Sequence, residues 1–390
     1  MLRFLTAGES HGACLTGIIE GLPSGLFIDV AGINRELRRR QIGYGRGDRM
    51  NIETDSVQIT SGVRHGLTIG SPISFAIQNK DWRNWQDAMS VEPVIEGTEI
   101  RSVVLPRPGH ADLAGSMKYD THDVRNILER ASARETAARV AAGAICRLFL
   151  SAFGISIGSH TVAIGRVSIA EKFESLSGEK ILCANPESPL RCVDPVAEKR
   201  MMALIDETGI AGDTLGGAAD IFASGVPPGL GSHIQWDRRL DGQIAHAMMS
   251  IPAVKAVEIG SAIAGAQKPG SEVHDAITYD QNIRRFRRMT NNAGGIEGGI
   301  SNGEDIRVRI HIKPIPTLRN ALKSANIITK EASKAVVERS DLCVVPAAGV
   351  IAEAVLAAAL AGAFLEKFGG DSMKEIENNH ACYLKRLSDY

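Results

Sequence analysis

Gly8–Leu26 reads GESHGACLTGIIEGLPSGL and Gly212–Leu230 reads GDTLGGAADIFASGVPPGL, so one pattern occurs twice at a spacing of 204 residues. Six identical positions recur without a gap, at Gly8, Gly12, Gly21, Pro23, Gly25 and Leu26 and again at Gly212, Gly216, Gly225, Pro227, Gly229 and Leu230. Leu128-Glu129-Arg130 and Val337-Glu338-Arg339 also resemble each other, and each comes before an alanine-rich run. Coincidence in a chain with 40 glycines is the alternative explanation. If the duplication is real, residues 1–390 form a single pseudo-symmetric body with halves of about 1–205 and 206–390.

The two copies differ at the position where chemistry is expected. His11 in the first copy corresponds to Leu215 in the second. A duplicated scaffold that keeps one histidine predicts one active site per chain rather than two.

Hydrophobic periodicity around these segments predicts a mixed α+β fold. Ile306–Ile312 alternates strictly between apolar and charged residues, as expected for a half-buried strand, and 57–60 and 73–78 show the same pattern more weakly. Helices are predicted at 34–40, 132–152, 195–208, 239–249, 318–339 with interruptions and 347–368, and loops at 43–50, 267–274 and 284–302. Alternating strands favour antiparallel sheets packed against long apolar helices.

Bulk composition excludes several classes of protein. The formal net charge of −1 gives no support to a protein that coats nucleic acid. The six cysteines show no CxxC pairing, so neither a metal site nor a disulfide framework is indicated. No signal peptide opens the chain, and the apolar run 350–365 is interrupted by Glu353 and too short for a membrane span. We therefore expect a cytoplasmic protein that contacts neither membrane nor nucleic acid.

Two glycine-flanked loops carry histidines that suit acid–base chemistry. Arg107-Pro108-Gly109-His110-Ala111-Asp112 places a histidine near an arginine, and Gly8–Gly12 places His11 in a similar loop. Ser132-Ala133-Arg134-Glu135 reads as a capping box that opens a helix, where free N–H groups and the helix dipole favour an anion. These features predict proton transfer on a small, multiply anionic ligand. The alternative is that each histidine only hydrogen-bonds a neighbouring loop.

Further segments are candidates for binding anions or a cofactor. Arg38–Arg49 contains five arginines, which bind phosphate and carboxylate bidentately, although a solvated helix end followed by a surface loop also explains them. Asn291–Gly299 lacks P-loop and Rossmann spacing, which leaves a backbone cradle for a phosphate-bearing cofactor, and Lys313–Thr317 follows it closely. Arg339-Ser340-Asp341 is either a structural ion pair or part of a site at the seam between the halves.

Taken together, these motifs resemble the chorismate synthase family. The resemblance rests on Gly8–Gly12, Gly45–Arg49, Arg107–Asp112, Glu129–Ala142, Asn291–Gly299 and Lys313–Thr317, which are spread over nearly the whole chain. It implies a β-α-β sandwich with an internal pseudo-two-fold repeat, assembled as a homotetramer, and this agrees with the repeat described above.

The resemblance implies a lyase of the shikimate pathway, active in aromatic amino acid biosynthesis. In that family 5-enolpyruvylshikimate 3-phosphate loses phosphate and a ring proton in an anti-1,4-elimination that gives chorismate. The family requires reduced FMN although the reaction has no net redox change, because the flavin supplies the difficult electronic step. The flavin is reduced either by NADPH on the protein itself or by a separate flavin reductase. The sequence shows no added reductase domain, which favours the separate enzyme.

The resemblance also assigns roles to individual residues. His11 protonates or stabilises the departing phosphate, His110 keeps the reduced flavin suitably protonated, and Asp341 helps to relay the ring proton, with the flavin N5 as one route. Substrate binding is assigned to Ser10, Arg40, Arg46, Arg49, Arg107 and Arg134. Flavin contacts are assigned to Ser132, Ala133, Arg134, Ala253, Gly298, Lys313, Pro314, Ile315, Pro316, Thr317 and Arg339, while Arg40 and Arg46 match positions associated with NADPH.

Some positions depart from the family pattern, and other functions stay open. Pro252 stands where relatives can carry an amide, Gly260–Ile263 replaces the usual Gly-Asp-Gly-Phe, and Tyr119–His122 is unusual. None of these departures removes a proposed catalytic group. One rival is a flavin oxidoreductase with net hydride transfer on the same scaffold. Another is a non-catalytic binder of RNA or polyanions, against which the near-zero charge and the lack of aromatics between the arginines argue.

Overall fold

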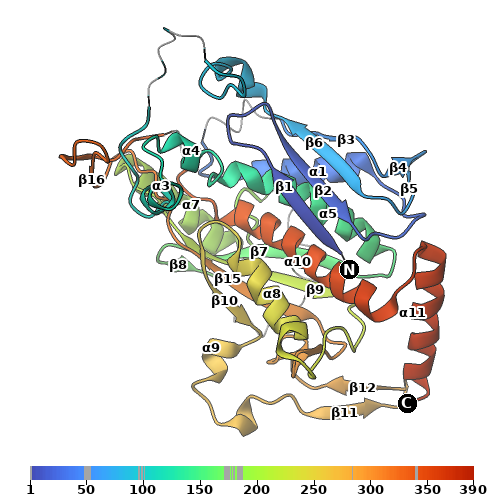
Figure 1. The fold of residues 1–390 in the computed structure, drawn as a ribbon. Coiled ribbons are helices and arrows are strands. Elements are labelled where there is room, and N and C mark those ends of the chain that lie inside the picture. The colour runs from blue at the N-terminus through green and yellow to red at the C-terminus, as the bar shows by residue number, and fades with distance from the viewer. Residues whose placement is uncertain are drawn as a thin grey trace.

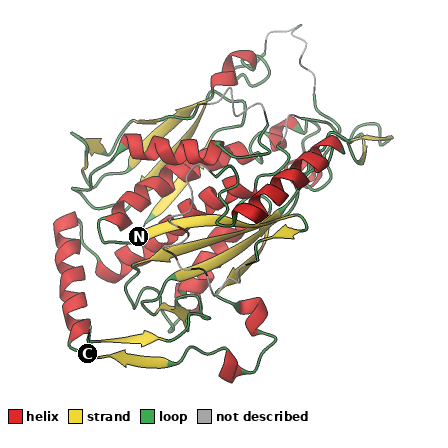
Figure 2. Ribbon diagram, turned by 180° about the vertical axis from the view of Figure 1, so that it is seen from behind, coloured by secondary structure: helices red, strands yellow, loops and turns green. Residues whose placement is uncertain are grey.

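Two antiparallel sheets lie on opposite sides of a layer of long helices (Figure 1). The computed structural model describes residues 2–47, 54–94, 97, 100, 102–170, 176, 178, 181, 188–282, 284–338 and 341–390. Seen from behind, the strands of both sheets flank the same helices (Figure 2). The mixed α+β class predicted from the sequence is confirmed.

The strands form two main sheets and several short pairs. The first sheet has the order β1 (Arg3–Ala7), β2 (Cys14–Glu20), β6 (Ile73–Gln78), β3 (Val57–Ile59), and the second has the order β10 (Val254–Ile259), β15 (Ile306–Ile312), β9 (Gly217–Ser224), β7 (Ser156–Ile164), β8 (Val167–Ser168). The short pairs are β4 (Val63–Arg64) with β5 (Leu67–Thr68), β11 (Ile277–Asp280) with β12 (Arg285–Arg288), β13 (Ile296–Glu297) with β14 (Ile300–Ser301), and β16 (Lys323–Ala325) with β17 (Ala332–Lys334).

The helices fill the space between the sheets and cover their ends. The α-helices are α1 (Val30–Gln41), α3 (Asp112–Tyr119), α4 (Arg125–Leu128), α5 (Thr136–Ser151), α7 (Pro195–Ile210), α8 (Leu240–Met249), α9 (Ala262–Gly265), α10 (Val345–Phe368) and α11 (Met373–Ser388). The short 3-10 helices are η1 (Lys80–Asn84), η2 (Ala133–Glu135), η4 (Trp236–Arg238) and η5 (Gly270–Glu272).

The aligned segments of the two halves have the same local structure. In the first half the Thr68 hydroxyl donates to the Pro23 carbonyl (2.6 Å) and accepts from the Leu26 amide (2.9 Å). In the second half the Ser301 hydroxyl donates to Pro227 (2.7 Å) and accepts from Leu230 (2.8 Å). The strand order β1-β2-β6-β3 also matches β7-β9-β15-β10, in the same order along the chain.

The helices α5 and α10 pack against each other at the centre of the protein. Gly143 makes this approach possible, because a Cβ atom there would lie 2.4 Å from the Cβ of Ala354. Among the described residues, α10 is the helix long and apolar enough to cross a membrane, but 78% of its most apolar window is buried inside the protein. Its apolar composition is therefore explained by its place in the core.

One buried carboxylate ties the helices to the second sheet. Glu353 on α10 is 1% exposed and binds Arg39 of α1 (2.8 and 2.9 Å), Arg147 of α5 (2.9 Å) and Arg191 (3.2 Å). It also accepts a 2.6 Å hydrogen bond from Ser159 of β7. Burial raises the pKa of this carboxyl, but the charges of the three arginines outweigh burial and lower it from 4.5 to about 2.

Several predicted elements are confirmed and others are wrong. The strands 73–78 and 306–312 and the helices that became α1, α5, α7, α8 and α10 are present within a few residues of the prediction. The helix predicted at 318–339 is wrong, because this segment forms β16 and β17 and bonds its backbone to Val104 and Leu105 instead. The loop predicted at 284–302 is wrong in part, because β12, β13 and β14 lie within it. The capping box is incomplete, since the Glu135 carboxylate binds Thr6 and Arg139 rather than the Ser132 backbone.

Candidate active site

A cavity of about 510 Å³ opens between residues of both halves of the chain. Most of the predicted site residues line it, namely Ser10, His11, Arg40, Arg46, Arg107, His110, Ser132, Ala133, Arg134, Ala253, Lys313, Ile315, Pro316, Thr317 and Asp341. Residues scattered over more than 300 positions of sequence thus meet in one place.

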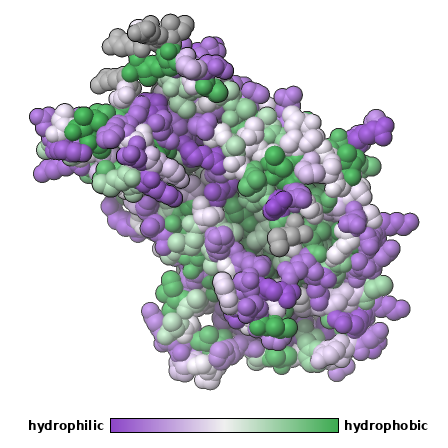
Figure 3. Space-filling view, in the orientation of Figure 1, coloured by the Kyte–Doolittle hydropathy of each residue, from purple (hydrophilic) through white to green (hydrophobic). Residues whose placement is uncertain are grey.

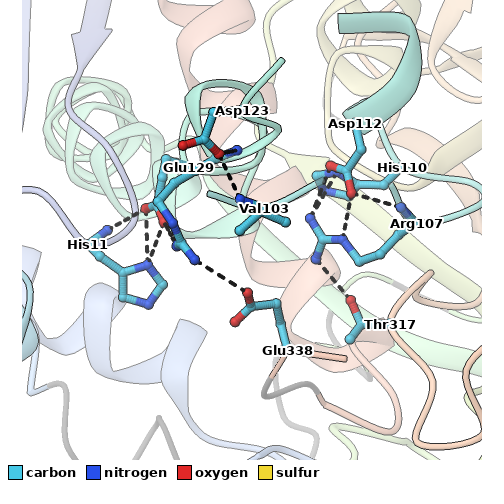
Figure 4. A network of polar contacts seen from close by, with 10 residues as sticks. His11, Val103, Arg107, His110, Asp112, Asp123, Glu129, Thr317 and Glu338 are labelled. Carbon is cyan, nitrogen blue, oxygen red and sulfur yellow. Dashed lines mark hydrogen bonds and ion pairs between the residues drawn. The ribbon is translucent and has the colours of Figure 1, made fainter. Parts of the chain in front are cut away.

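Glu129 holds one edge of the His11 ring (Figure 4), and Trp85 covers one face of it. Its Nδ1 lies 2.9 and 3.0 Å from the two carboxylate oxygens of Glu129, and its backbone N–H donates to the same carboxylate at 2.8 Å. Its ring stacks on Trp85 with centroids 3.9 Å apart. Burial raises the pKa of Glu129, but the hydrogen bonds and charge of His11 and the charge of Arg125 outweigh burial and hold that pKa below its usual range.

His110 belongs to a second, separate network (Figure 4). Its Nδ1 pairs with Asp112, the first residue of α3, and that carboxylate also accepts from the Nε (2.9 Å) and backbone N–H (3.0 Å) of Arg107. Arg107 in turn donates to the Thr317 hydroxyl at 3.0 Å. Burial opposes ionisation of Asp112, but the bonds from His110 and Arg107 hold its pKa well below the usual range. A charged carboxylate therefore orients both the histidine and the arginine.

Two buried arginines share one carboxylate at the start of α5. Arg134 donates to Asp55 at 2.6 Å and to the Asn79 side chain at 2.9 Å. Arg40 donates to Thr136 (2.9 Å), and its Nη1 lies 3.6 Å from Asp55, beyond hydrogen-bond distance. Burial lowers the pKa of Arg40 from 12.5 to about 9, and the positive charge of Arg134 adds to this effect. Two positive charges buried beside the cavity favour an incoming anion.

Asp341 lies just before α10, close enough to Arg40 for their charges to interact. Its carboxylate accepts from Arg46 at 2.8 Å and from the backbone N–H of Gly47 at 2.7 Å. The loop that precedes residue 48 therefore holds Asp341 in place. Asp341 and Arg46 line the same cavity as His11 and His110.

The remaining wall suits a planar group that carries a phosphate. Ile251, Ala347, Ala348 and Ile351 give it an apolar surface. At its rim Lys313 donates to the Gly109 carbonyl at 2.8 Å, and burial together with the charge of Lys255 lowers the pKa of this lysine. Within the described residues, no cluster of three or more histidine, cysteine, aspartate or glutamate side chains is arranged to hold a metal.

Some predicted site residues lie elsewhere. Pro314 and Gly298 are not among the residues that line the cavity, and Gly298 lies in the turn between β13 and β14. Arg49 and Arg339 lie outside the described residues.

Other residues of the site were not singled out from the sequence. Asp112 and Glu129 lie within the motifs Arg107–Asp112 and Glu129–Ala142. In each motif, a carboxylate close to a histidine or arginine in the sequence could have identified the residue. Trp85 and Asp55 come from segments with no clear periodicity, and only the folded chain brings them to His11 and Arg134.

Known proteins resemble this chain over its full length. A family model described as chorismate synthase matches residues 2–365. The chorismate synthase of Solibacter usitatus is 53% identical over 390 residues and 100% of both chains, and that of Geobacter sulfurreducens is 55% identical over 99% of each. A crystal structure of a chorismate synthase, 44% identical in sequence, superposes with a TM-score of 0.81 and covers 100% of this chain and 99% of that one.

Proposed function

The chain belongs to the chorismate synthase family, and from this premise we propose that the 510 Å³ cavity is its active site. Members of this family are lyases of the shikimate pathway, which convert 5-enolpyruvylshikimate 3-phosphate to chorismate and phosphate. The proposal rests on one observation above all: His11 and His110 face a single cavity that arginines surround.

The arginines bind the three anionic groups of the substrate. Arg40, Arg46, Arg107 and Arg134 line the cavity, and Ser10 adds a hydroxyl beside that of Ser132, 3.1 Å away. Arginine forks suit phosphate and carboxylate because they offer paired donors in a fixed plane. Arg49 is assigned to the same role by its position in the family motif.

His11 and Asp341 take part in the proton transfers of the elimination. As the bond between the ring carbon and the phosphate oxygen breaks, His11 donates a proton to that oxygen and stabilises the departing charge. Asp341 takes part in accepting the ring proton, and Arg46 and Gly47 hold its carboxylate ready. His110, fixed by Asp112, lies at the same cavity and keeps the cofactor in its reactive protonation state.

The family implies a flavin cofactor, and the cavity has the wall that such a group needs. We assign the flavin, as reduced FMN, to Ser132, Ala133, Arg134, Ala253, Lys313, Ile315, Pro316 and Thr317, which line the cavity, and to Arg339 by its position in the family motif. When bound, reduced FMN supplies electron density to the reacting ring without net oxidation. Two sources of the reduced cofactor are alternatives, NADPH bound at Arg40 and Arg46 or a separate flavin reductase, and we favour the separate reductase.

The assembly and location follow from the same premise. The matching turns at Thr68 and Ser301 support two pseudo-repeats within one domain, arranged as a β-α-β sandwich. Apolar side chains are scattered over the surface (Figure 3) and include Leu5 of β1, 73% exposed, and Phe286 of β12, 52% exposed. Such side chains suit contacts in a homotetramer. We place the enzyme in the cytoplasm, bound to neither membrane nor nucleic acid.

Anaerobic turnover tests the proposed function. The purified protein is mixed with reduced FMN and 5-enolpyruvylshikimate 3-phosphate, and chorismate, phosphate and the flavin spectrum are followed together. Equal release of both products with the flavin still reduced is the expected result. Oxidation of one flavin per turnover would indicate an oxidoreductase. Salt-sensitive RNA binding without flavin binding would indicate a polyanion-binding protein.

A further inference from the structure

The geometry points to Glu129 as a positioning residue that fixes the proton arrangement of His11 and turns its Nε2 toward the cavity. This inference rests on the proposed role of His11 as the proton donor to the departing phosphate. Glu129 itself is not among the residues that line the cavity, so it acts through the histidine.

The contacts of Glu129 require a proton on Nδ1 of His11. Both carboxylate oxygens lie within 3.0 Å of Nδ1, and one of them also accepts the backbone N–H of His11 at 2.8 Å. The Glu129 side chain is 1% exposed, and the lowered pKa of this carboxyl keeps it ionised. An ionised carboxylate only accepts hydrogen bonds, so Nδ1 must carry a proton. Nε2 is the ring nitrogen that remains for a ligand.

Neighbouring side chains hold the same unit rigid. Trp85 stacks on the imidazole, and its indole N–H donates to Asp81 at 3.1 Å. Arg125 donates to Glu129 at 3.0 Å and lies over the Trp85 ring, 4.9 Å from its centroid. The ring of His11 is thus fixed at one edge by a charge and on one face by an aromatic plane.

This arrangement serves the proton transfer in two ways. Because Glu129 keeps the Nδ1 proton in place, the proton that goes to the phosphate oxygen is the one that Nε2 carries in the imidazolium form. After the transfer His11 is neutral with its remaining proton on Nδ1, so Nε2 is ready to accept the next proton. A glutamine at position 129 keeps the shape but loses the charge, and its amide can donate as well as accept.

The second half of the chain supplies a matched control. Glu338 occupies the position in its motif that Glu129 occupies in the first, while Leu215 replaces the histidine. Glu338 borders the cavity and lies 4.0 Å from Arg125, too far for a hydrogen bond. E338Q therefore removes one negative charge beside the same cavity without touching His11.

The test compares E129Q with E338Q, alone and combined with His11→Ala. We expect E129Q to lower kcat by about tenfold to a hundredfold with little change in KM, a loss of the size found when carboxylates that orient metal-binding histidines are replaced. In the His11→Ala background E129Q should lower kcat no further, because its effect passes through the histidine. A wild-type kcat in E129Q, or an equal further loss without His11, overturns the inference.

A second readout does not depend on activity. In protein labelled with 15N-histidine, the His11 signal, assigned from its loss in His11→Ala, should show a protonated Nδ1 in the wild type and in E338Q. The E129Q variant should show a mixture of tautomers. A His11 with bare Nδ1 in the wild type overturns the inference even if the enzyme is active. A protonated Nδ1 in a protein that does not make chorismate would instead contradict the proposed function alone.

Discussion

Replacing Glu353 with glutamine should destabilise the protein without altering the shape of its core. Glu353 joins α1, α5, α10 and β7 through Arg39, Arg147 and Ser159, and its side chain is 1% exposed. Glutamine preserves the volume and can keep the bond from Ser159, but it removes the charge that the surrounding arginines share. The variant therefore isolates the electrostatic part of this cluster.

The magnitude follows from the pKa of Glu353. The carboxyl titrates at about 2 in the folded protein against 4.5 for the unperturbed group, and each pKa unit corresponds to about 1.4 kcal/mol. The charge of Glu353 thus contributes about 3 kcal/mol near pH 7, within the range of about 3–5 kcal/mol found when one partner of a buried ion pair is removed. Because the folded pKa is the lower one, this contribution is complete above about pH 4.5 and is lost as the pH falls towards 2.

The assay is urea unfolding of wild type and E353Q by far-ultraviolet circular dichroism. Both proteins are measured at the same concentration, because association shifts apparent stability. We expect E353Q to be less stable by about 3 kcal/mol at pH 7, and the difference to narrow as the pH falls below about 4.5. A loss under about 1 kcal/mol, or a difference that does not change with pH, would show that the charge of Glu353 does not stabilise the fold.

Three further predictions concern the core, the site and the cysteines. Gly143→Ala should cost about 1–3 kcal/mol in urea unfolding, because the added methyl group meets Ala354 at 2.4 Å; unchanged stability would show that α5 and α10 can separate freely. His110→Ala should lower kcat by about 10²–10⁴-fold while the circular dichroism spectrum stays that of the wild type, and full activity would remove His110 from the mechanism. Burial raises the pKa of Cys146 to about 12 and that of Cys343 to about 11, so a thiol reagent at pH 8 should label the exposed Cys382 and spare both; rapid modification of Cys146 would contradict the packing of α5.

The sequence predicts those helices and strands in which the residue types follow a regular local pattern. The strict alternation of Ile306–Ile312 gives the bounds of β15, and the alanine-rich run before Phe368 gives the end of α10. The failed helix at 318–339 had acceptable local propensity, but the pairing of β16 with β17 satisfied the extended backbone, and Ile327 and Val336 bonded to Val104 and Leu105. Propensity is a weak prior, and tertiary contacts override it.

The candidate site also contains residues that the sequence predicts and contacts that only the folded structure reveals. His11, His110 and the arginines are visible in the sequence because reactive residue types stand in glycine-built loops. The stacking of Trp85 on His11 and the sharing of Asp55 by Arg40 and Arg134 depend on segments far apart in the chain. No local pattern encodes such a contact, so the fold was needed to find the groups that orient the proposed catalytic residues.

A crystal structure of the protein with 5-enolpyruvylshikimate 3-phosphate and FMN tests the central claim most directly. We expect both ligands to lie in the cavity between the two halves, with the phosphate of the substrate at hydrogen-bond distance from His11 Nε2 and its carboxylates on the arginines. Ligands bound elsewhere, for example in the smaller cavity lined by Ser261 and Asp275, would contradict it.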